Sequence, residues 1–493
     1  MIIDFVTSII DRGRRLLSLQ AANNQLQVSD LQAMCLSVLQ RRGEATALAA
    51  ASELLDRVAA GGPDAATELF QVLAHDLGVD RQAVLAAAAT YEQEDNWRRL
   101  RALMHSLEPR RQELLRRLNM VPGGTMAIVK LREHLLPLLA TDPALAPVDA
   151  DFLHLLSSWF NRGFLTLQRI SWDSPASLLD KVKEYEAVHE IADWHDLRRR
   201  LDVDRRCFGF FHPSLEGEPL IFIEVALRQE LSSSIQEILD QGSPRLAADA
   251  ATHAIFFSIS NCQAGLRGVS FGHFLIKQVV VELQKELPNL QVFSTLSPIP
   301  GFRKWLTANL ASGEIDMPEA PVIGLQQLCA RKAITPEDVA PYQEVLLALC
   351  ARYLSSIDVA KKDRDPVARF HLGNGARLER LNWGGDISQK GLAQSFGILV
   401  NYFYDLTSLE ENHEAFYNAE RVTVSSQIAK MLAPRPDNVA VAGERRATER
   451  KTIERRTTER KTSERKADER KAAEQKAEDQ KAGNGKNSVM QGR

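Results

Sequence analysis

Residues 254–306 read AIFFSISNCQAGLRGVSFGHFLIKQVVVELQKELPNLQVFSTLSPIPGFRKWL, and the order of elements in this stretch decides the fold. The first seven residues are apolar and aromatic, which is typical of a buried strand. A glycine-bearing turn follows at 261–272, and apolar residues then recur at helical spacing up to Leu283. A second apolar run, 290–296, stops at two prolines, and a further helix is predicted to begin near Arg303. The stretch therefore predicts strand, glycine turn, helix, strand and helix.

The glycine turn is a candidate phosphate-binding loop. Glycines let an anion approach the backbone closely, and the free N–H groups at a helix N-terminus attract negative charge. The spacing fits neither the P-loop pattern, because no Gly-Lys-Ser/Thr follows, nor a dinucleotide-binding fingerprint. On the residues alone, a tight turn whose glycines serve the backbone angles is the preferred interpretation.

Ser297 lies at the end of the second predicted strand, where open α/β sheets usually place their ligands. Pro298, Pro300 and Gly301 follow directly and fix the direction of the chain at this point. A Ser-Pro pair at a strand end is more often a turn former than a catalyst. Position alone therefore does not make Ser297 catalytic.

The composition excludes several classes of protein. The 493 residues suffice for two or more domains, and a net charge of −3 with 44% hydrophobic residues is ordinary for a globular protein. No apolar run reaches membrane-spanning length, and Asp4 interrupts the first apolar residues where a secretory signal needs a longer apolar core. The five scattered cysteines lack Cys-x-x-Cys spacing, which indicates free thiols in a reducing compartment and no metal site. We therefore expect a soluble, cytoplasmic protein without a membrane span.

The chain divides into three predicted regions. Residues 1–192 carry apolar stripes at helical spacing, nearly uninterrupted from 29 to 190, which predicts an all-α bundle with a packing or oligomerisation role. Residues 193–435 begin with two strand-like runs joined at 215–219, which predicts a hairpin, and continue into the stretch quoted above. In the tail, 436–493, Glu recurs every five residues among alternating charges. That pattern favours a disordered or solvated helical tail and argues against a nucleic-acid partner.

Eight short motifs resemble the malonyl-CoA decarboxylase family. In chain order they are NRGFL at 161–165, ISW at 170–172, YEAVHEI at 185–191, HP at 212–213, GEPL at 217–220, GHFLIK at 272–277, LSPIPGF at 296–302 and FHLGNGA at 370–376. The resemblance implies decarboxylation of malonyl-CoA to acetyl-CoA and CO2, without a cofactor beyond the CoA of the substrate. It also implies an α+β fold in which the helical bundle precedes a GNAT-type N-acetyltransferase-like mixed α/β catalytic domain that binds acyl-CoA. A homo-oligomer, either a dimer or a tetramer, is expected from it as well.

The resemblance assigns roles to individual residues. Ser297 matches the family's catalytic serine, a proton acceptor, and His371 matches the catalytic histidine, a proton donor. Histidine suits this role because its pKa ordinarily lies near working pH. Tyr404 matches a tyrosine near the same site. The CoA pyrophosphate and the malonyl-CoA are expected to bind at Arg267, Gly268, Val269, Ser270, Phe271, Gly272 and His273, with Ser297 and His371 at the acyl end.

Other interpretations stay open at this point. Asn374, Asn382, Asp386 and Asn401 are further polar candidates that turn formation explains equally well. Fold alone does not settle function, so a CoA-dependent N-acyltransferase and a non-catalytic acyl-CoA-binding scaffold remain alternatives to the decarboxylase. The chain's last residues carry no Ser-Lys-Leu-type peroxisomal signal, which adds to the expectation of a cytoplasmic protein.

Overall fold

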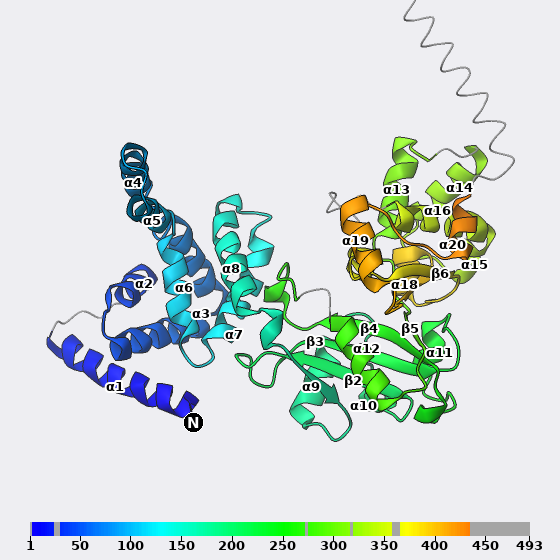
Figure 1. Cartoon of the computed structure of the whole chain (residues 1–493), viewed down its shortest axis with the longest axis horizontal. Coiled ribbons are helices and arrows are strands. Elements are labelled where there is room, and N and C mark those ends of the chain that lie inside the picture. Colours follow the sequence, from blue (N-terminus) through cyan, green and yellow to red (C-terminus); the bar gives the residue numbers. More distant parts are fainter. Residues whose placement is uncertain (1, 24–29, 272–274, 316–318, 357–364, 434–493) are drawn as a thin grey trace, which may run out of the picture. The chain divides into compact units, whose positions relative to one another are not determined.

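The computed structural model describes residues 2–23, 30–271, 275–315, 319–356 and 365–433 (Figure 1). Residues up to Ile428 form one compact unit, and a second unit begins at Ala429. The predicted charged tail, 436–493, lies outside the described residues. The sheet and all residues of the candidate site belong to the first unit.

The N-terminal part is helical, as predicted. Its α-helices are α1 (Ile2–Asn23), α2 (Leu31–Gln40), α3 (Glu44–His75), α4 (Arg81–Gln93), α5 (Trp97–Ser106), α6 (Arg110–Asn119), α7 (Gly124–Leu138) and α8 (Ala146–Trp159). Across the part of the chain that the structure describes, no helix combines the length and the apolar character needed to cross a membrane.

Local sequence explains how two of these helices begin and bend. The Asp30 side chain accepts a hydrogen bond from the Gln32 N–H and so caps the start of α2. α3 is kinked at Gly62, which takes a positive φ of 61° before the helix continues through Pro63. A glycine tolerates this left-handed conformation without the steric penalty of a side chain.

One strand lies inside the region that was predicted to be helical. Residues Thr166–Ile170 form β1, which pairs antiparallel with β2 (Arg205–Phe211). The helical prediction is wrong at β1. Among the described strands β1 pairs with β2 alone, and four of its five residues are not buried, so its sequence has no apolar run that would predict a strand. The predicted boundary at residue 192 stays a prediction, although it leaves this strand in the helical region.

The described strands form one seven-stranded sheet in the order β1-β2-β3-β4-β5-β7-β6. Beyond β1 and β2, the strands are β3 (Pro219–Arg228), β4 (His253–Asn261), β5 (Val292–Thr295), β6 (Arg377–Asn382) and β7 (Leu399–Phe403). The predicted β2–β3 hairpin is confirmed, as are the strands at β4 and β5. β4 and β5 run parallel, which needs a crossover connection that the intervening helix α12 (Leu275–Glu286) provides, and the other described strand pairs are antiparallel.

Short pairings of β5 join strands β1 to β4 to strands β7 and β6. β4 and β5 pair over four positions and end at Phe256 opposite Thr295. β5 then pairs with β7 at Ser294, and the chain beyond it makes an isolated bridge between Ser297 and Val400. β4 and the chain leaving β5 therefore diverge after Thr295, and Ser297 follows β7 instead.

The remaining described α-helices follow β1 along the chain. They are α9 (Ala176–Tyr185), α10 (Trp194–Arg200), α11 (Ile235–Leu239), α13 (Phe302–Ser312), α14 (Glu319–Ala330), α15 (Pro336–Val339), α16 (Gln343–Ser355), α17 (Pro366–Gly373), α18 (Gln389–Ser395), α19 (Leu409–Ala419) and α20 (Ser426–Leu432). The helix predicted near Arg303 is confirmed as α13.

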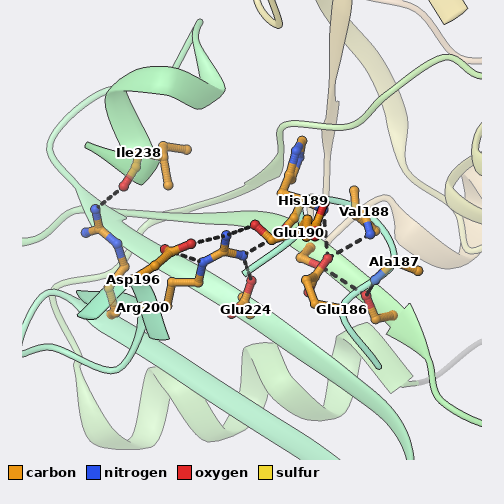
Figure 2. Close-up of polar contacts among 12 residues, drawn as sticks. Glu186, Ala187, Val188, His189, Glu190, Asp196, Arg200, Glu224 and Ile238 are labelled. Atoms are coloured by element: carbon orange, nitrogen blue, oxygen red, sulfur yellow. Dashed lines mark hydrogen bonds and ion pairs between the residues drawn. The ribbon is translucent and has the colours of Figure 1, made fainter. Parts of the chain in front are cut away.

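A buried charge network anchors α10 to the sheet (Figure 2). Arg200 is 2% exposed and donates hydrogen bonds to Asp196 at 2.9 Å and to Glu224 of β3 at 3.1 Å. It also donates to the carbonyl oxygens of His189 and Glu190. Burial raises the pKa of Glu224 to about 8, and the neighbouring Arg200 charge opposes that rise.

The loop before α10 is fixed to β4 by the same network (Figure 2). Glu186 accepts hydrogen bonds from the Ser258 hydroxyl at 2.7 Å and from the backbone N–H groups of Val188 and His189. Lys390 of α18 donates to the carbonyl oxygens at the same loop. The polar groups buried beneath α10 are therefore largely paired, as burial requires.

Replacing Arg200 tests the contribution of this network to stability. Arg200→Met removes the counter-charge of the buried Asp196 and the hydrogen-bond donor of the buried Glu224, so we expect the free energy of unfolding to fall by about 3–5 kcal/mol. Arg198→Met on the same helix removes an exposed arginine and is expected to cost about 1 kcal/mol or less. Urea denaturation measures both, and equal losses would contradict a structural role for the network.

Candidate active site

Ser297 is positioned by backbone pairing at the end of β5. Its N–H donates to the Val400 carbonyl at 2.8 Å, and the Val400 N–H donates to the Ser297 carbonyl at 3.0 Å. The side chain is 5% exposed. The prediction that Ser297 ends a strand with its direction fixed by the following turn agrees with this geometry.

His371 is carried by α17, whose start is tied to the turn that follows Ser297. Asp365 caps the helix by accepting from the N–H groups of Val367 and Ala368, and it also accepts from the Gly301 N–H at 2.9 Å. One carboxylate thus joins the turn after Ser297 to the helix that bears His371. Burial raises the pKa of Asp365, and its three backbone N–H bonds act against that rise.

Ser297, His371 and Tyr404 form one hydrogen-bonded series. His371 Nε2 lies 3.2 Å from Ser297 Oγ, and His371 Nδ1 lies 2.7 Å from the Tyr404 hydroxyl oxygen. If the Tyr404 O–H donates to Nδ1, the imidazole proton is on Nε2 and points at Ser297; the other tautomer reverses both bonds. The structure therefore brings together all three residues that the resemblance assigns to catalysis.

Burial sets the protonation state of this series. His371 is 3% exposed, and burial lowers its pKa to about 3 because the imidazolium loses its hydration. Burial also raises the pKa of Tyr404 well above its ordinary value. The expectation that His371 titrates near working pH is thus wrong for this environment: both groups are neutral across the physiological range.

A cavity of about 640 Å³ lies at the glycine turn. Its walls come from the start of β3, the end of β4, the turn itself, α17 and α19. Arg267 and Arg369 both line it, and neither guanidinium has a hydrogen bond or ion pair with the residues that the structure describes. Within that same described set, the lining contains no carboxylate. The cavity is therefore suited to an anionic ligand.

The predicted CoA-binding residues are distributed as follows. Arg267, Gly268, Val269, Ser270 and Phe271 line the cavity. Gly272 and His273 lie outside the described residues.

The cavity approaches the catalytic series without including it. Phe370, which precedes His371 on α17, and Asn374, which follows the last residue of that helix, line the cavity, whereas Ser297 and His371 are not part of the lining. The edge of β4 beyond Phe256 runs between the catalytic series and the cavity. It begins beside Thr295, faces no β5 partner among the described residues, and ends at Asn261 in the cavity wall.

The family follows from comparison with known proteins. The profile of the malonyl-CoA decarboxylase C-terminal domain matches residues 163–442, and the profile of the N-terminal domain matches residues 77–160. The chain belongs to the malonyl-CoA decarboxylase family. The mitochondrial malonyl-CoA decarboxylase of Anser anser anser is 36% identical over 405 residues, which is 75% of this chain and 80% of that protein.

Solved structures of the malonyl-CoA decarboxylase family are similar to this chain over most of their length. The Rhodopseudomonas palustris malonyl-CoA decarboxylase is 46% identical with a TM-score of 0.78, covering 81% of this chain and 98% of that one. The Agrobacterium vitis protein is 45% identical with a TM-score of 0.76, covering 82% of this chain and 100% of that one.

Within this member of the malonyl-CoA decarboxylase family, sequence reasoning missed two residues around His371. Thr295 Oγ1 accepts hydrogen bonds from Ser297 Oγ at 2.9 Å and from the Tyr402 N–H at 3.1 Å. The Tyr402 ring stacks on His371, with centroids 4.7 Å apart and planes at 23°. The sequence carried a weak signal for both residues. Side chains two residues apart on a strand share a face, and Thr295 precedes Ser297 by two residues, as Tyr402 precedes Tyr404.

The four additional polar candidates have different places. Asn374 lines the cavity, and its amide donates to the Phe370 carbonyl. Asn382 donates to Asn401, and Asn401 donates to the Thr295 carbonyl at 2.6 Å, so both join β6 and β7 to β5. Asp386 accepts hydrogen bonds from Gln236 and from the Ser388 N–H, which is a local structural role.

The lowered pKa of His371 predicts a pH dependence of stability. The folded protein favours the neutral ring, whereas the unfolded chain takes up a proton near pH 6.5. The contribution is therefore present above pH 6.5 and is lost as pH falls from 6.5 toward 3. Between about pH 7 and pH 5 we expect the wild type to lose about 2 kcal/mol more than His371→Gln in urea denaturation. Parallel losses in the two proteins would contradict a buried neutral imidazole.

Proposed function

We propose that this chain decarboxylates malonyl-CoA to acetyl-CoA and carbon dioxide, with Ser297 and His371 at the acyl group. The observation that carries the proposal is the series Ser297, His371 and Tyr404, buried next to a cavity that presents two arginines. The relatives' names support the choice of substrate. We propose no cofactor beyond the CoA portion of the substrate.

The reaction rearranges the electrons of one carbon–carbon bond. The bond between the carboxylate carbon and the α-carbon breaks, carbon dioxide leaves, and the electron pair moves into the thioester carbonyl to give an enolate. A proton then reaches the α-carbon, and the carbonyl re-forms as acetyl-CoA. The protein must hold the thioester, stabilise the enolate oxygen and supply the proton.

We propose that His371, in its neutral form, supplies that proton from Nε2 while its Nδ1 takes the Tyr404 hydroxyl proton. The imidazole thus stays neutral, and the tyrosinate left behind regains its proton from solvent, so one proton is consumed per turnover. With the Tyr404 O–H donating to Nδ1, the imidazole presents its Nε2–H toward Ser297. Ser297 Oγ accepts this hydrogen bond in the proposed arrangement, and its role as the proton acceptor stays a prediction. The buried surroundings also favour loss of the malonyl carboxylate as uncharged carbon dioxide, because they provide less hydration for the anion than water does.

The CoA portion is proposed to occupy the cavity at the glycine turn. Arg267 and Arg369 are suited to its phosphates, since a guanidinium binds phosphate oxygens in a bidentate manner. The pantetheine arm would then follow the edge of β4 from Asn261 toward Phe256, where strand backbone groups can bind its amides. This path ends beside Thr295 and hence beside the catalytic series.

We also propose that the sheet is of the GNAT N-acetyltransferase type. Support comes from the antiparallel run of β1 to β4, followed by the parallel β4–β5 pair that diverges after four positions. In this assignment the acyl-CoA occupies the divergence, at the carboxyl end of β4.

Incubating the purified chain with malonyl-CoA tests the function directly. Acetyl-CoA and carbon dioxide in equal amounts, formed without an acceptor, are the expected products. A requirement for an amine would identify a CoA-dependent N-acyltransferase instead. Binding of CoA without turnover would identify a non-catalytic acyl-CoA-binding scaffold.

The roles of Ser297 and His371 predict the kinetics of their variants. Ser297→Ala and His371→Ala are each expected to lower kcat at least about tenfold, because each removes a group that handles the proton. The double variant should be little worse than either, since the residues act in one series. His195→Ala, which removes an exposed imidazole on α10, serves as the control. Near-normal rates in both single variants would remove these residues from the mechanism.

We propose a homo-oligomer, a dimer or a tetramer, that uses α4 and α5. Neither helix buries any residue against the rest of the described chain, and Leu85, Trp97 and Met104 are exposed on them. Exposed apolar side chains gathered on one hairpin are typical of an interaction surface.

Charge substitutions on these helices test the surface. Leu85→Lys combined with Trp97→Lys should lower the mass found by light scattering, because burying two ammonium groups is unfavourable. Ile323→Lys, at another exposed apolar position on α14, is the control. An unchanged mass in the double variant would contradict the proposed interface.

A cytoplasmic location is also proposed. All five cysteines lack a disulfide partner, and four of them are buried, as expected in a reducing compartment. The mitochondrial names belong to the relatives. Recovery of the protein in an organelle fraction after cell fractionation would overturn this location.

A further inference from the structure

We propose that Arg132, on α7 of the helical region, is a positioning residue for the glycine turn and thereby determines the affinity of the cavity for the phosphates of CoA. The inference rests on the proposed function, because it takes CoA as the ligand of this cavity. Neither the resemblance nor the sequence pattern singled out Arg132, which reads as one more charge on a helix.

Arg132 bonds directly to the turn. Its side chain is buried, and its Nη1 donates to the carbonyl oxygens of Gly265 at 2.8 Å and Arg267 at 2.6 Å. Its Nε donates to Asp149 of α8 at 2.8 Å, which holds the guanidinium in place. An arginine has the rigid donor geometry for such a multiple contact, whereas a lysine has a single mobile donor group.

The glycine turn also packs closely against α7 and α8, the helices that carry Arg132 and Asp149. A Cβ at Gly265 would lie 1.9 Å from the Val129 carbonyl oxygen of α7, so no other residue fits there. Gly268 has a φ of 87°, and a Cβ added there would lie 3.5 Å from the Leu153 side chain of α8. The turn therefore takes its shape from α7 and α8 as well as from its own sequence.

Peptide geometry links Arg132 to the cavity. The C=O and N–H of one trans peptide point in opposite directions. The peptide between Arg267 and Gly268 directs its C=O to Arg132, so the Gly268 N–H points away from Arg132. Gly268 lines the cavity, and its N–H has no hydrogen-bond partner among the described residues. Arg132 thus directs one backbone donor toward a bound anion and fixes the residue that carries the Arg267 guanidinium.

The contacts of Arg132 bear on the binding of CoA and not on the proton transfer. Ser297 and His371 are held by β7 and by Asp365, which Arg132 does not contact. Loss of Arg132 should therefore weaken ligand binding and leave the proton transfer intact. A residue with a purely structural role would lower stability without this selectivity.

Arg111 provides a matched control in the same helical region. It is buried, pairs with Asp151 of α8, and donates to the carbonyl oxygens of Leu73 and Pro147. Arg111 thus reproduces the chemistry of Arg132, including one carboxylate and two carbonyls. None of its partners belongs to the turn.

The experiment compares Arg132→Gln with Arg111→Gln in the full chain. For Arg132→Gln we expect the KM for malonyl-CoA and the calorimetric Kd for CoA to rise about tenfold, with kcat within about twofold of wild type. Arg111→Gln should lose comparable stability in urea with KM and Kd unchanged. Unchanged KM and Kd in folded Arg132→Gln, or equal increases in both variants, would overturn the inference.

Two further measurements keep the inference testable. Arg132→Lys keeps a charge, but its single nitrogen cannot replace both Nε, which bonds Asp149, and Nη1, which bonds the two carbonyls. A several-fold rise in Kd is therefore expected for this variant if the Gln variant does not fold, and a wild-type Kd would overturn the proposal. Measuring the Kd for CoA by calorimetry also distinguishes the proposed decarboxylation from the proposed role of Arg132. If the wild type binds CoA without decarboxylating malonyl-CoA, the proposed function fails while a weakened Kd in Arg132→Gln still supports the inference.

Discussion

The backbone pairing of Ser297 with Val400 is the constraint on which the site depends. β5 leaves β4 after Thr295, and the two hydrogen bonds between Ser297 and Val400 hold the chain against β7 where it leaves β4. The same strand, β7, leads to Tyr404 four residues later, so one ladder fixes both ends of the catalytic series. Groups held by backbone pairing need little further ordering when a substrate binds.

His371 reaches this ladder from outside the sheet. Its helix is located by Asp365, which bonds to the turn that follows Ser297. The imidazole is then enclosed by Tyr402 on one face and hydrogen-bonded at both nitrogens. Enclosure makes the ring neutral and keeps water away from the enolate that the proposed reaction forms.

The order of elements between residues 254 and 306 could be predicted from sequence because buried strands and amphipathic helices leave strong periodic patterns. β1 could not, since an exposed edge strand of five residues has no such pattern. Ser297 and His371 were found through family motifs. Single-sequence reasoning could not pair them, because 74 residues separate them and no local rule brings them together. Arg132 could not be identified from the sequence for the same reason. The carbonyls that it bonds lie more than 130 residues away, and a backbone carbonyl is not marked by any residue type.

The two arginines of the cavity have a consequence for the kinetics of encounter. With no carboxylate in the described lining to neutralise them, Arg267 and Arg369 project a positive potential from the mouth of the cavity into the solvent. A polyanion such as CoA is drawn along that field before any contact forms, which accelerates its diffusion to the site. Dissolved salt shortens the reach of the field to a Debye length of about 8 Å at physiological ionic strength. Ionic strength therefore controls how fast the ligand arrives, independently of how fast it reacts.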